Sequence, residues 1–267
     1  MKGRRPDTFV TICMLLMGIA VVSIGSNVLV VVLQGAKSLF RSVSQSETRF
    51  AIGLSVGSAC VSTLVCFLLA VPTAYVLTRS SFPGRSAIEG VLELTMTLPN
   101  IVLGLSLLII FASPFGKVLK KTGFAVVFNP KGVVIAQLVV NLPFAIKLAS
   151  AAFRDVNVKL EHVAGLLGAS PFRQFTSVLL PLSKNSLISA VILIWSRALG
   201  EFGATMMLVG VTRMKTETLP ASIYLNVSVN DLDGALSSAF ILLMISAVSF
   251  LVADWLTRRG GKRSRYE

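Results

Sequence analysis

Six long apolar segments, separated by shorter polar ones, constrain the fold of this chain more than any other feature. A helix needs about 20 apolar residues to cross the hydrocarbon core of a bilayer, and each segment is long enough. Charged residues make up 14% of the chain, well below the roughly 25% of a soluble domain. Because the backbone must satisfy its own hydrogen bonds inside lipid, we expect an all-α, polytopic membrane protein. It forms a single domain, residues 1–267, with spans at about 8–33, 50–77, 88–113, 132–153, 184–209 and 235–256.

The basic residues predict which ends of the spans face the cytoplasm. Six spans place both termini on one side of the membrane. With the termini inside, the inner segments hold 14 of the 25 Lys and Arg residues and the outer loops hold nine. Basic residues favour cytoplasmic loops, so this count predicts a multi-pass protein of the cell membrane with both termini cytoplasmic. Four outer lysines run against the trend: Lys117, Lys120, Lys121 and Lys131.

Several classes of site are disfavoured. The net charge of +13 would suit nucleic acid, but the basic residues are scattered, without interleaved aromatic residues, so we expect no nucleic-acid partner. Cys13, Cys60 and Cys66 lie in apolar runs and are expected to be core or lipid-facing thiols. His162 is the single histidine and has no ligand-like neighbours at metal spacing, so no metal site is expected.

The stretch 160–181 is amphipathic but too polar to cross a membrane. Asn157 or Asp155 can cap a first short helix, which Gly168 is predicted to end. The helical period places four apolar residues of this helix on one face, Leu160, Val163, Ala164 and Leu167.

Ser170 and Pro171 read as the N-cap and first residue of a second helix. Its apolar stripe comprises Phe172, Phe175, Val178 and Leu179, before Pro181 restarts the chain. Helices of roughly ten residues are unstable alone in water. The segment 153–181 therefore predicts a docking element that packs on a partner.

Two prolines predict breaks in the spans. Proline removes a backbone donor, so the third span should kink or break at Pro99, beside Asn100, and the fourth near Asn141 and Pro143. Polar groups at such breaks, including Thr95, Thr97, Asn100 and Asn141, could line a polar path or could simply satisfy the backbone that proline disrupts.

Arg197 and Glu201 are the informative charges inside the fifth span. Charged groups at bilayer depth should face protein or water. Being four residues apart, they can pair with each other on one helix. They can form an intrahelical or interhelical ion pair that locks the bundle, or they can line or gate an anion path. The small residues Gly200, Gly203 and Ala204 beside them predict a tight helix crossing under either interpretation. For Lys147 and Glu93, snorkelling toward the cytoplasmic interface is the simplest interpretation.

Catalytic motifs are missing from the sequence. There is no phosphate-binding loop of the form G-x-x-x-x-G-K-[ST], no G-x-S-x-G elbow and no H-E-x-x-H pair. A membrane enzyme would need a nucleophile–base pair that we do not find. A self-sufficient carrier or channel is the remaining rival, which would need titratable groups for ion coupling but no docking helix.

The docking stretch resembles a known motif. Nine residues separate Gly168 from Val178, which is followed by Leu179, Leu180 and Pro181. This spacing is similar to the cytoplasmic loop of permease subunits in bacterial and archaeal ABC importers, E-A-A-x₃-G-x₉-I-x-L-P. Here His162-Val163-Ala164 occupies the first three positions, so only Ala164 matches, and Glu161 stands one place early.

The resemblance extends over about residues 50–256. Val71-Pro72-Thr73-Ala74-Tyr75, Phe82-Pro83-Gly84-Arg85, Leu98-Pro99 with Gly104, and Leu142-Pro143-Phe144 follow one another along the chain, ending with the segment RALGEFGAT at 197–205. Together they look like the molybdate/tungstate permease group, with the sulfate permeases close by.

This resemblance implies a six-span permease of the type I importer arrangement. It implies uptake of molybdate or tungstate, or alternatively sulfate or thiosulfate, by a complex containing a second copy of the chain, two cytoplasmic ABC ATPases and an external oxyanion-binding protein. ATP and Mg would bind the ATPases, and no cofactor would bind this chain. A coupling helix within 157–179 would dock on each ATPase through Glu161, His162, Ala164, Gly168, Ala169, Ser170, Pro171, Phe172 and Pro181. The path, or the locking of the bundle, would involve Arg197, Glu201, Pro99, Asn100 and Asn141.

Overall fold

The chain folds entirely into helices over the part that the structure describes. The computed structural model describes residues 8–263, with the backbone alone for residues 253, 254 and 256–263. Lys2, Arg4, Arg5 and Arg265, which enter the charge count, lie outside the described residues. The elements are α1 (Thr8–Gly35), α2 (Leu39–Ser44), α3 (Ser46–Arg79), α4 (Arg85–Thr97), α5 (Asn100–Ala112), α6 (Pro114–Lys121), α7 (Pro130–Arg154), α8 (Val158–Leu166), α9 (Pro171–Gln174), the π-helical turn η1 (Phe175–Leu179), α10 (Leu180–Leu199), α11 (Gly203–Val209), α12 (Leu219–Ser228) and α13 (Leu232–Arg263).

The predicted spans correspond to long apolar helices. Five helical segments are each long and apolar enough to cross a membrane: α1, α3, α7, α13 and the continuous run from Pro171 to Leu199. The pair α4 and α5 makes a sixth if it is counted as one broken span. The fifth span begins earlier than predicted, at Pro171. It also ends earlier, at Leu199, and the residues from there to Val209 belong to a break and to α11.

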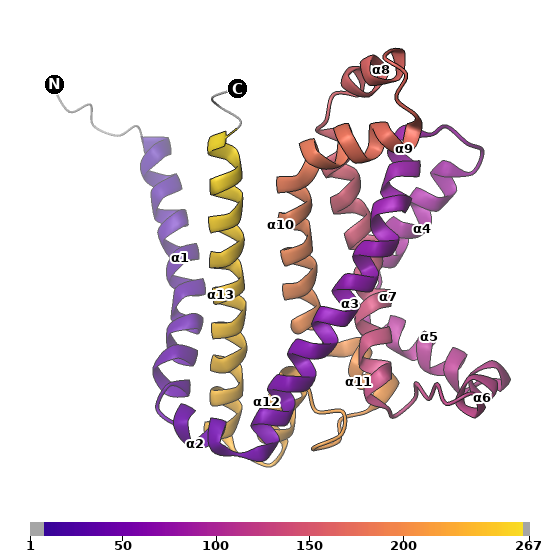
Figure 1. Cartoon of the computed structure of the whole chain (residues 1–267). Coiled ribbons are helices and arrows are strands. Elements are labelled where there is room, and N and C mark those ends of the chain that lie inside the picture. Colours follow the sequence, from indigo (N-terminus) through magenta and orange to yellow (C-terminus); the bar gives the residue numbers. More distant parts are fainter. Residues whose placement is uncertain (1–7, 264–267) are drawn as a thin grey trace, which may run out of the picture.

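The break predicted at Pro99 is confirmed. The axes of α4 and α5 diverge by 109° across Leu98 and Pro99. Leu98 has an extended backbone with ψ 138°, as expected for a residue that precedes proline. The third span therefore bends sharply, and α5 extends sideways from the bundle (Figure 1).

The break predicted near Pro143 is wrong. The helix α7 runs without interruption through Asn141 and Pro143. Pro143 is buried in the bundle, where α3 and α10 pack against α7. Packing on both sides holds the helical path although proline withdraws one donor, as is common where neighbouring helices confine a membrane helix.

Pro181 does not restart the chain either. The backbone is helical from Pro171 to Leu199, with one π-helical turn, η1, before the proline. The amide of Leu180 donates to the carbonyl of Phe175, five residues back. Such a wide turn inserts an extra residue into the helix at the point where the proline ring follows.

Small side chains allow the central helices to approach closely. Ala74, Ala145 and Ala149 are buried between α3 and α7, and similar alanines occur along both helices. Gln137 of α7 is buried too; its side chain donates to Ser58 and to the carbonyl of Ala198, and accepts from Ser62. Membrane helices associate through such small residues and interhelical hydrogen bonds.

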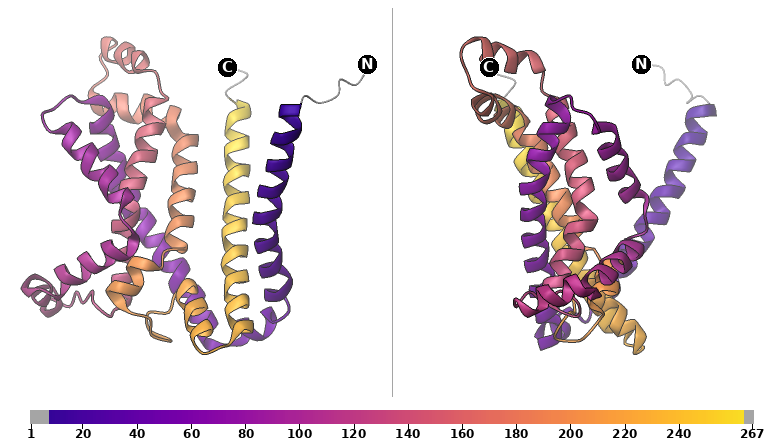
Figure 2. Two further views of the ribbon diagram at one scale, coloured as in Figure 1. Left: turned by 180° about the vertical axis from the view of Figure 1, so that it is seen from behind. Right: turned by 90° about the vertical axis from the view of Figure 1, so that its right-hand side faces the viewer.

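The two ends of the bundle differ. The start of α1, the end of α13 and the α8 segment lie at one end, whereas α2, α6 and α12 lie at the other (Figures 1 and 2). The helix α1 packs along α13 and is otherwise exposed. We call the first the α8 end and the second the α6 end.

Candidate functional site

The docking segment folds as two capped helices. Asn157 Oδ1 accepts a hydrogen bond from the amide of Lys159 at 3.0 Å, which caps α8. Gly168 has a φ of +88° just after α8, a conformation that favours glycine. Ser170 Oγ accepts from the amide of Arg173 at 3.4 Å and caps the next helix. These three local predictions are confirmed.

An apolar ridge on this segment is uncovered. Leu166, Leu167 and Phe172 are 88%, 84% and 76% exposed, and Leu160 and Val163 are about half exposed. We call these five residues the α8 ridge. The α8 segment projects from one end of the molecule beyond the long helices (Figure 1). Large exposed apolar patches mark interaction sites.

The other predicted docking residues lie in different surroundings. His162, Gly168, Ser170 and Pro171 are exposed, and Ala164 and Ala169 are half-buried. Glu161 points inward and is buried. Pro181 lies beyond η1 on α10, beside an apolar hollow lined by residues of that helix. The structure thus brings the residues from 160 to 172 together at the projecting segment and leaves Pro181 outside it.

A buried ion pair ties α8 to the bundle. The guanidinium of Arg79, the last residue of α3, donates to Glu161 Oε1 at 2.8 Å. It also donates to the carbonyls of Phe153 and Val156, at 2.8 and 3.2 Å. The two charged side chains are only 9% and 6% exposed.

Our sequence reasoning missed Arg79. A signal was present, because Glu161 is the only acidic residue between Val156 and Gly200 and Arg79 directly ends an apolar run. Pairing them requires knowing that the end of α3 lies beside α8, which the sequence pattern does not give.

Arg197 and Glu201 do not share a helix. The helix α10 ends at Leu199, between them, and no ion pair joins them among the described residues. The expected intrahelical pair is therefore wrong. Arg197 is exposed and lies over the ring of Phe144, 5.1 Å from its centroid.

Glu201 instead connects α5 to α11. Its carboxylate accepts from Asn100 Nδ2 at 2.6 Å and from the amide of Ala204 at 2.8 Å. Glu201 is only 4% exposed, and its charge lies at the N-terminus of α11, where carboxylates are favoured. Pro99 places Asn100 at the start of α5, so these predicted residues do come together. Asn141 does not join them: its Nδ2 donates within α7 to the carbonyl of Gln137.

The predicted tight crossing is formed by α5 and α11. A Cβ at Gly104 of α5 would lie 2.6 Å from Ala204 Cα, and one at Gly203 would lie 3.4 Å from Asn100 Cβ. The two backbones are nearly in contact beside Glu201.

We expect Gly104→Val to separate α5 from α11. Overpacking of this kind costs about 1–3 kcal/mol, so thermal unfolding of the detergent-solubilised protein should shift to lower temperature. Gly57→Val is the matched control, because a Cβ there meets nothing within 4 Å. Equal shifts in both variants would contradict a tight crossing at Gly104.

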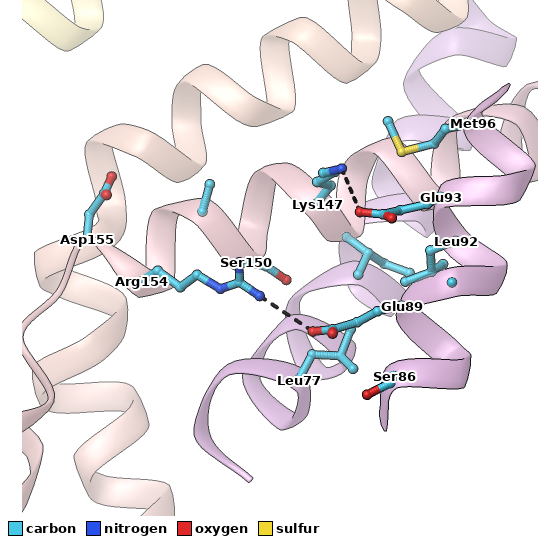
Figure 3. Close-up of a pocket in the computed structure, with 13 residues that line it drawn as sticks. Leu77, Ser86, Glu89, Leu92, Glu93, Met96, Lys147, Ser150, Arg154 and Asp155 are labelled. Atoms are coloured by element: carbon cyan, nitrogen blue, oxygen red, sulfur yellow. Dashed lines mark hydrogen bonds and ion pairs between the residues drawn. The ribbon is translucent and has the colours of Figure 1, made fainter. Parts of the chain in front are cut away.

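A charged cavity of about 590 Å³ opens between α4 and α7, with Leu77 of α3 on its wall (Figure 3). Lys147 Nζ lies 3.2 Å from Glu93 Oε1, and Arg154 lies 3.5 Å from Glu89 Oε1. The snorkelling interpretation of Lys147 and Glu93 misses this: each has the other as its partner. The side chains of Lys147 and Glu93 are both more than half exposed. A face carrying such charges should meet water or protein rather than lipid.

Among the residues whose side chains the structure describes, no group of three or more His, Cys, Asp or Glu is arranged to hold a metal ion. The described parts offer an exposed apolar ridge, a helix crossing and a charged cavity.

Comparison with solved structures shows to which known fold the chain corresponds. The fold matches a crystal structure of a bacterial ABC transporter involved in the import of the acidic polysaccharide alginate, with a TM-score of 0.74, 20% identity and coverage of 94% of this chain and 96% of that one. The chain thus has the fold of a transmembrane subunit of an ABC importer.

Sequence comparison gives the family. Residues 67–266 match the family described as the binding-protein-dependent transport system inner membrane component, and the chain belongs to it. Molybdenum transport system permease protein ModB of Haemophilus influenzae is 33% identical, over 80% of this chain and 95% of the relative. Molybdate/tungstate transport system permease protein WtpB of Pyrococcus furiosus is 34% identical, over 77% of each chain.

Proposed function

We propose that this chain is the membrane-spanning subunit of an ATP-driven importer for a tetrahedral oxyanion, molybdate or tungstate. The choice of cargo rests on the names of the relatives, since ModB and WtpB permeases match most of the chain. The coupling to an outside energy source rests on one structural observation, the uncovered α8 ridge.

The α8 ridge is the surface on which a cytoplasmic ATPase docks. It lies on the short helix α8 and the residue after it, and on the first turn of the continuous helix from Pro171 to Leu199. Alone in water, a helix as short as α8 is unstable. Amphipathic helices that place apolar anchors in a groove are a recurrent mode of protein recognition. In a complex of two copies of this chain with two ATPases, each ridge would lie in a groove of one ATPase. ATP and Mg would bind to the ATPases and not to this chain.

The orientation follows from this assignment. The first residues of α1 and the last residues of α13 lie at the α8 end of the bundle (Figure 1). Docking of this end on a cytoplasmic ATPase therefore places both termini in the cytoplasm. The external oxyanion-binding protein would then meet the α6 end.

The translocation path lies along the faces that carry uncovered charge. Arg197 is exposed beside the α10–α11 break, and the α4–α7 cavity carries Glu93 and Lys147 on its walls. Lipid is a poor neighbour for such groups. A second copy of the chain facing these surfaces would enclose a polar path between the two subunits.

We expect the isolated chain to bind neither molybdate nor tungstate tightly. A dianion site requires several convergent donors, whereas Arg197 lies over a ring and the basic residues of the cavity are paired with carboxylates. Titration of the detergent-solubilised chain with molybdate, tungstate and sulfate should show no saturable binding at concentrations that saturate a binding protein. Tight binding would mean that the chain selects the cargo itself.

Reconstitution tests the function directly. Vesicles containing this chain, its ATPase and its binding protein should take up molybdate or tungstate only when ATP is inside the compartment that holds the ATPase. Uptake of sulfate or thiosulfate instead would assign the chain to the sulfate permeases. Transport by the chain without any ATPase would establish the secondary-carrier alternative.

A further inference from the structure

The segment 113–131 at the α6 end combines four lysines with exposed aromatic and aliphatic side chains. Lys117, Lys120, Lys121 and Lys131 occur here without a single acidic residue. These are the lysines that oppose the inside-positive trend. Their position outside therefore calls for a physical explanation.

The helix α6 separates charge from apolar surface. Lys117, Lys120 and Lys121 fall on one side at the helical period, and Phe115 and Val118 fall on the opposite side. Phe115 and Val118 are 59% and 62% exposed, so the rest of the chain covers neither. The helix is thus amphipathic with both faces free.

The corner between α5 and α6 fixes this orientation. Ser113 Oγ donates back to the carbonyl of Ile110, and Pro114 begins α6. A Cβ at Gly116 would overlap the carbonyl oxygen of Phe111, so the first turn of α6 packs directly on the end of α5. The helix lies at the end of a membrane segment, at the far side from α8 (Figure 2).

We propose that α6 lies at the membrane–water interface on the external side of the membrane that the chain spans. There it binds the headgroups of anionic phospholipids. An interfacial helix places its apolar side among the acyl chains and its lysines among the phosphates. The lipid therefore covers both faces of α6 at once. Lysines next to an anionic lipid surface are attracted to it. The inference rests on the proposed orientation, which places α6 outside, and does not depend on the cargo.

Protein partners fit these observations less well. A second copy carries the same lysines, so a two-fold contact through α6 would bring like charges together. An acidic surface of an external binding protein could meet the lysines, yet Phe115 and Val118 on the opposite side would stay uncovered.

Tryptophan quenching by brominated lipids tests the proposal. Phe115→Trp is introduced with Trp195→Phe and Trp255→Phe, which remove the two native tryptophans. The full chain is placed in phosphatidylcholine nanodiscs in which the bromine is carried either by phosphatidylglycerol or by phosphatidylcholine, at equal mole fraction. We expect quenching by both lipids and about threefold stronger quenching by brominated phosphatidylglycerol.

Charge substitutions separate lipid binding from other causes. Lys117→Gln with Lys120→Gln and Lys121→Gln should abolish the preference for phosphatidylglycerol while quenching persists. The matched control removes three charges elsewhere at the same end, Lys37→Gln with Arg41→Gln and Arg49→Gln, and should leave the preference unchanged.

Three results would overturn the proposal. Absence of quenching by either lipid would mean that protein covers the apolar face of α6. Equal quenching by both lipids in the Phe115→Trp protein would mean that the lysines select no headgroup. A preference that survives loss of the three lysines, together with weakened association of the external binding protein, would assign the lysines to that protein.

Discussion

Phe172→Asp is expected to abolish substrate uptake and ATPase association while membrane insertion is retained. Phe172 is 76% exposed on the α8 ridge, so the folded chain loses little when it becomes polar. A partner groove that covers the ring would instead have to bury a carboxylate. Loss of an aromatic anchor at an interface costs about 2–4 kcal/mol, which weakens association roughly 30-fold or more.

Co-purification with the tagged ATPase measures this effect. Phe172→Leu is the matched control, since it keeps an apolar side chain on the ridge and should retain most of the association. Equal recovery of the ATPase with the Asp variant and with the unchanged chain would refute docking through the ridge.

Gly168→Pro tests the turn that orients the ridge. The φ of Gly168 is +88°, and proline is confined to a φ near −65°. The amide that donates to the carbonyl of Gly165 at 2.9 Å would also be lost. The angle between α8 and α9 must change, so uptake and ATPase association should both fail although the spans still insert. Should association survive in both Gly168→Pro and Phe172→Asp, the docking assignment is wrong.

Breaking the Arg79–Glu161 pair is expected to uncouple ATP hydrolysis from uptake. The guanidinium links α3, the end of α7 and α8 through one buried side chain. In Glu161→Gln the Arg79 charge stays buried without its counterion, and removing one partner of a buried pair costs about 3–5 kcal/mol. The helix α8 should then be held less firmly to the ends of α3 and α7. The ATPase should still bind the exposed ridge, but uptake per ATP hydrolysed should fall about tenfold or more.

A charge swap distinguishes coupling from general destabilisation. Arg79→Glu combined with Glu161→Arg restores opposite charges but loses the donors to the carbonyls of Phe153 and Val156. Uptake per ATP hydrolysed should therefore recover only in part, but it should be higher in the double variant than in either single variant. The control is Glu47→Gln, which breaks a partly exposed Arg–Glu pair, the one with Arg213 at 2.6 Å, away from α8 and the proposed path, and should leave the ratio of uptake to hydrolysis nearly unchanged. Additive effects of the two single substitutions would show that no coupling passes through the pair.

Local rules explain which sequence predictions were confirmed. The caps at Asn157 and Ser170 and the turn at Gly168 depend on residues within a few positions of each other, which the sequence contains in full. The break at Pro99 has the same local cause. The same local rule was wrong at Pro143 and Pro181, which lie inside continuous helices. At Pro143 the helices α3 and α10 that pack on α7 decide the outcome.

The sequence by itself determined the class of fold, the approximate spans, and the helix caps and turn of the segment 157–173, because lipid requires long apolar helices and helix caps depend on nearby residues. Tertiary structure alone decided the partners of the charges. Glu201 binds Asn100, Glu161 binds Arg79 and Lys147 binds Glu93. The members of these pairs lie far apart in the sequence, and the apolar spans that carry them are too alike in pattern to show which helices become neighbours.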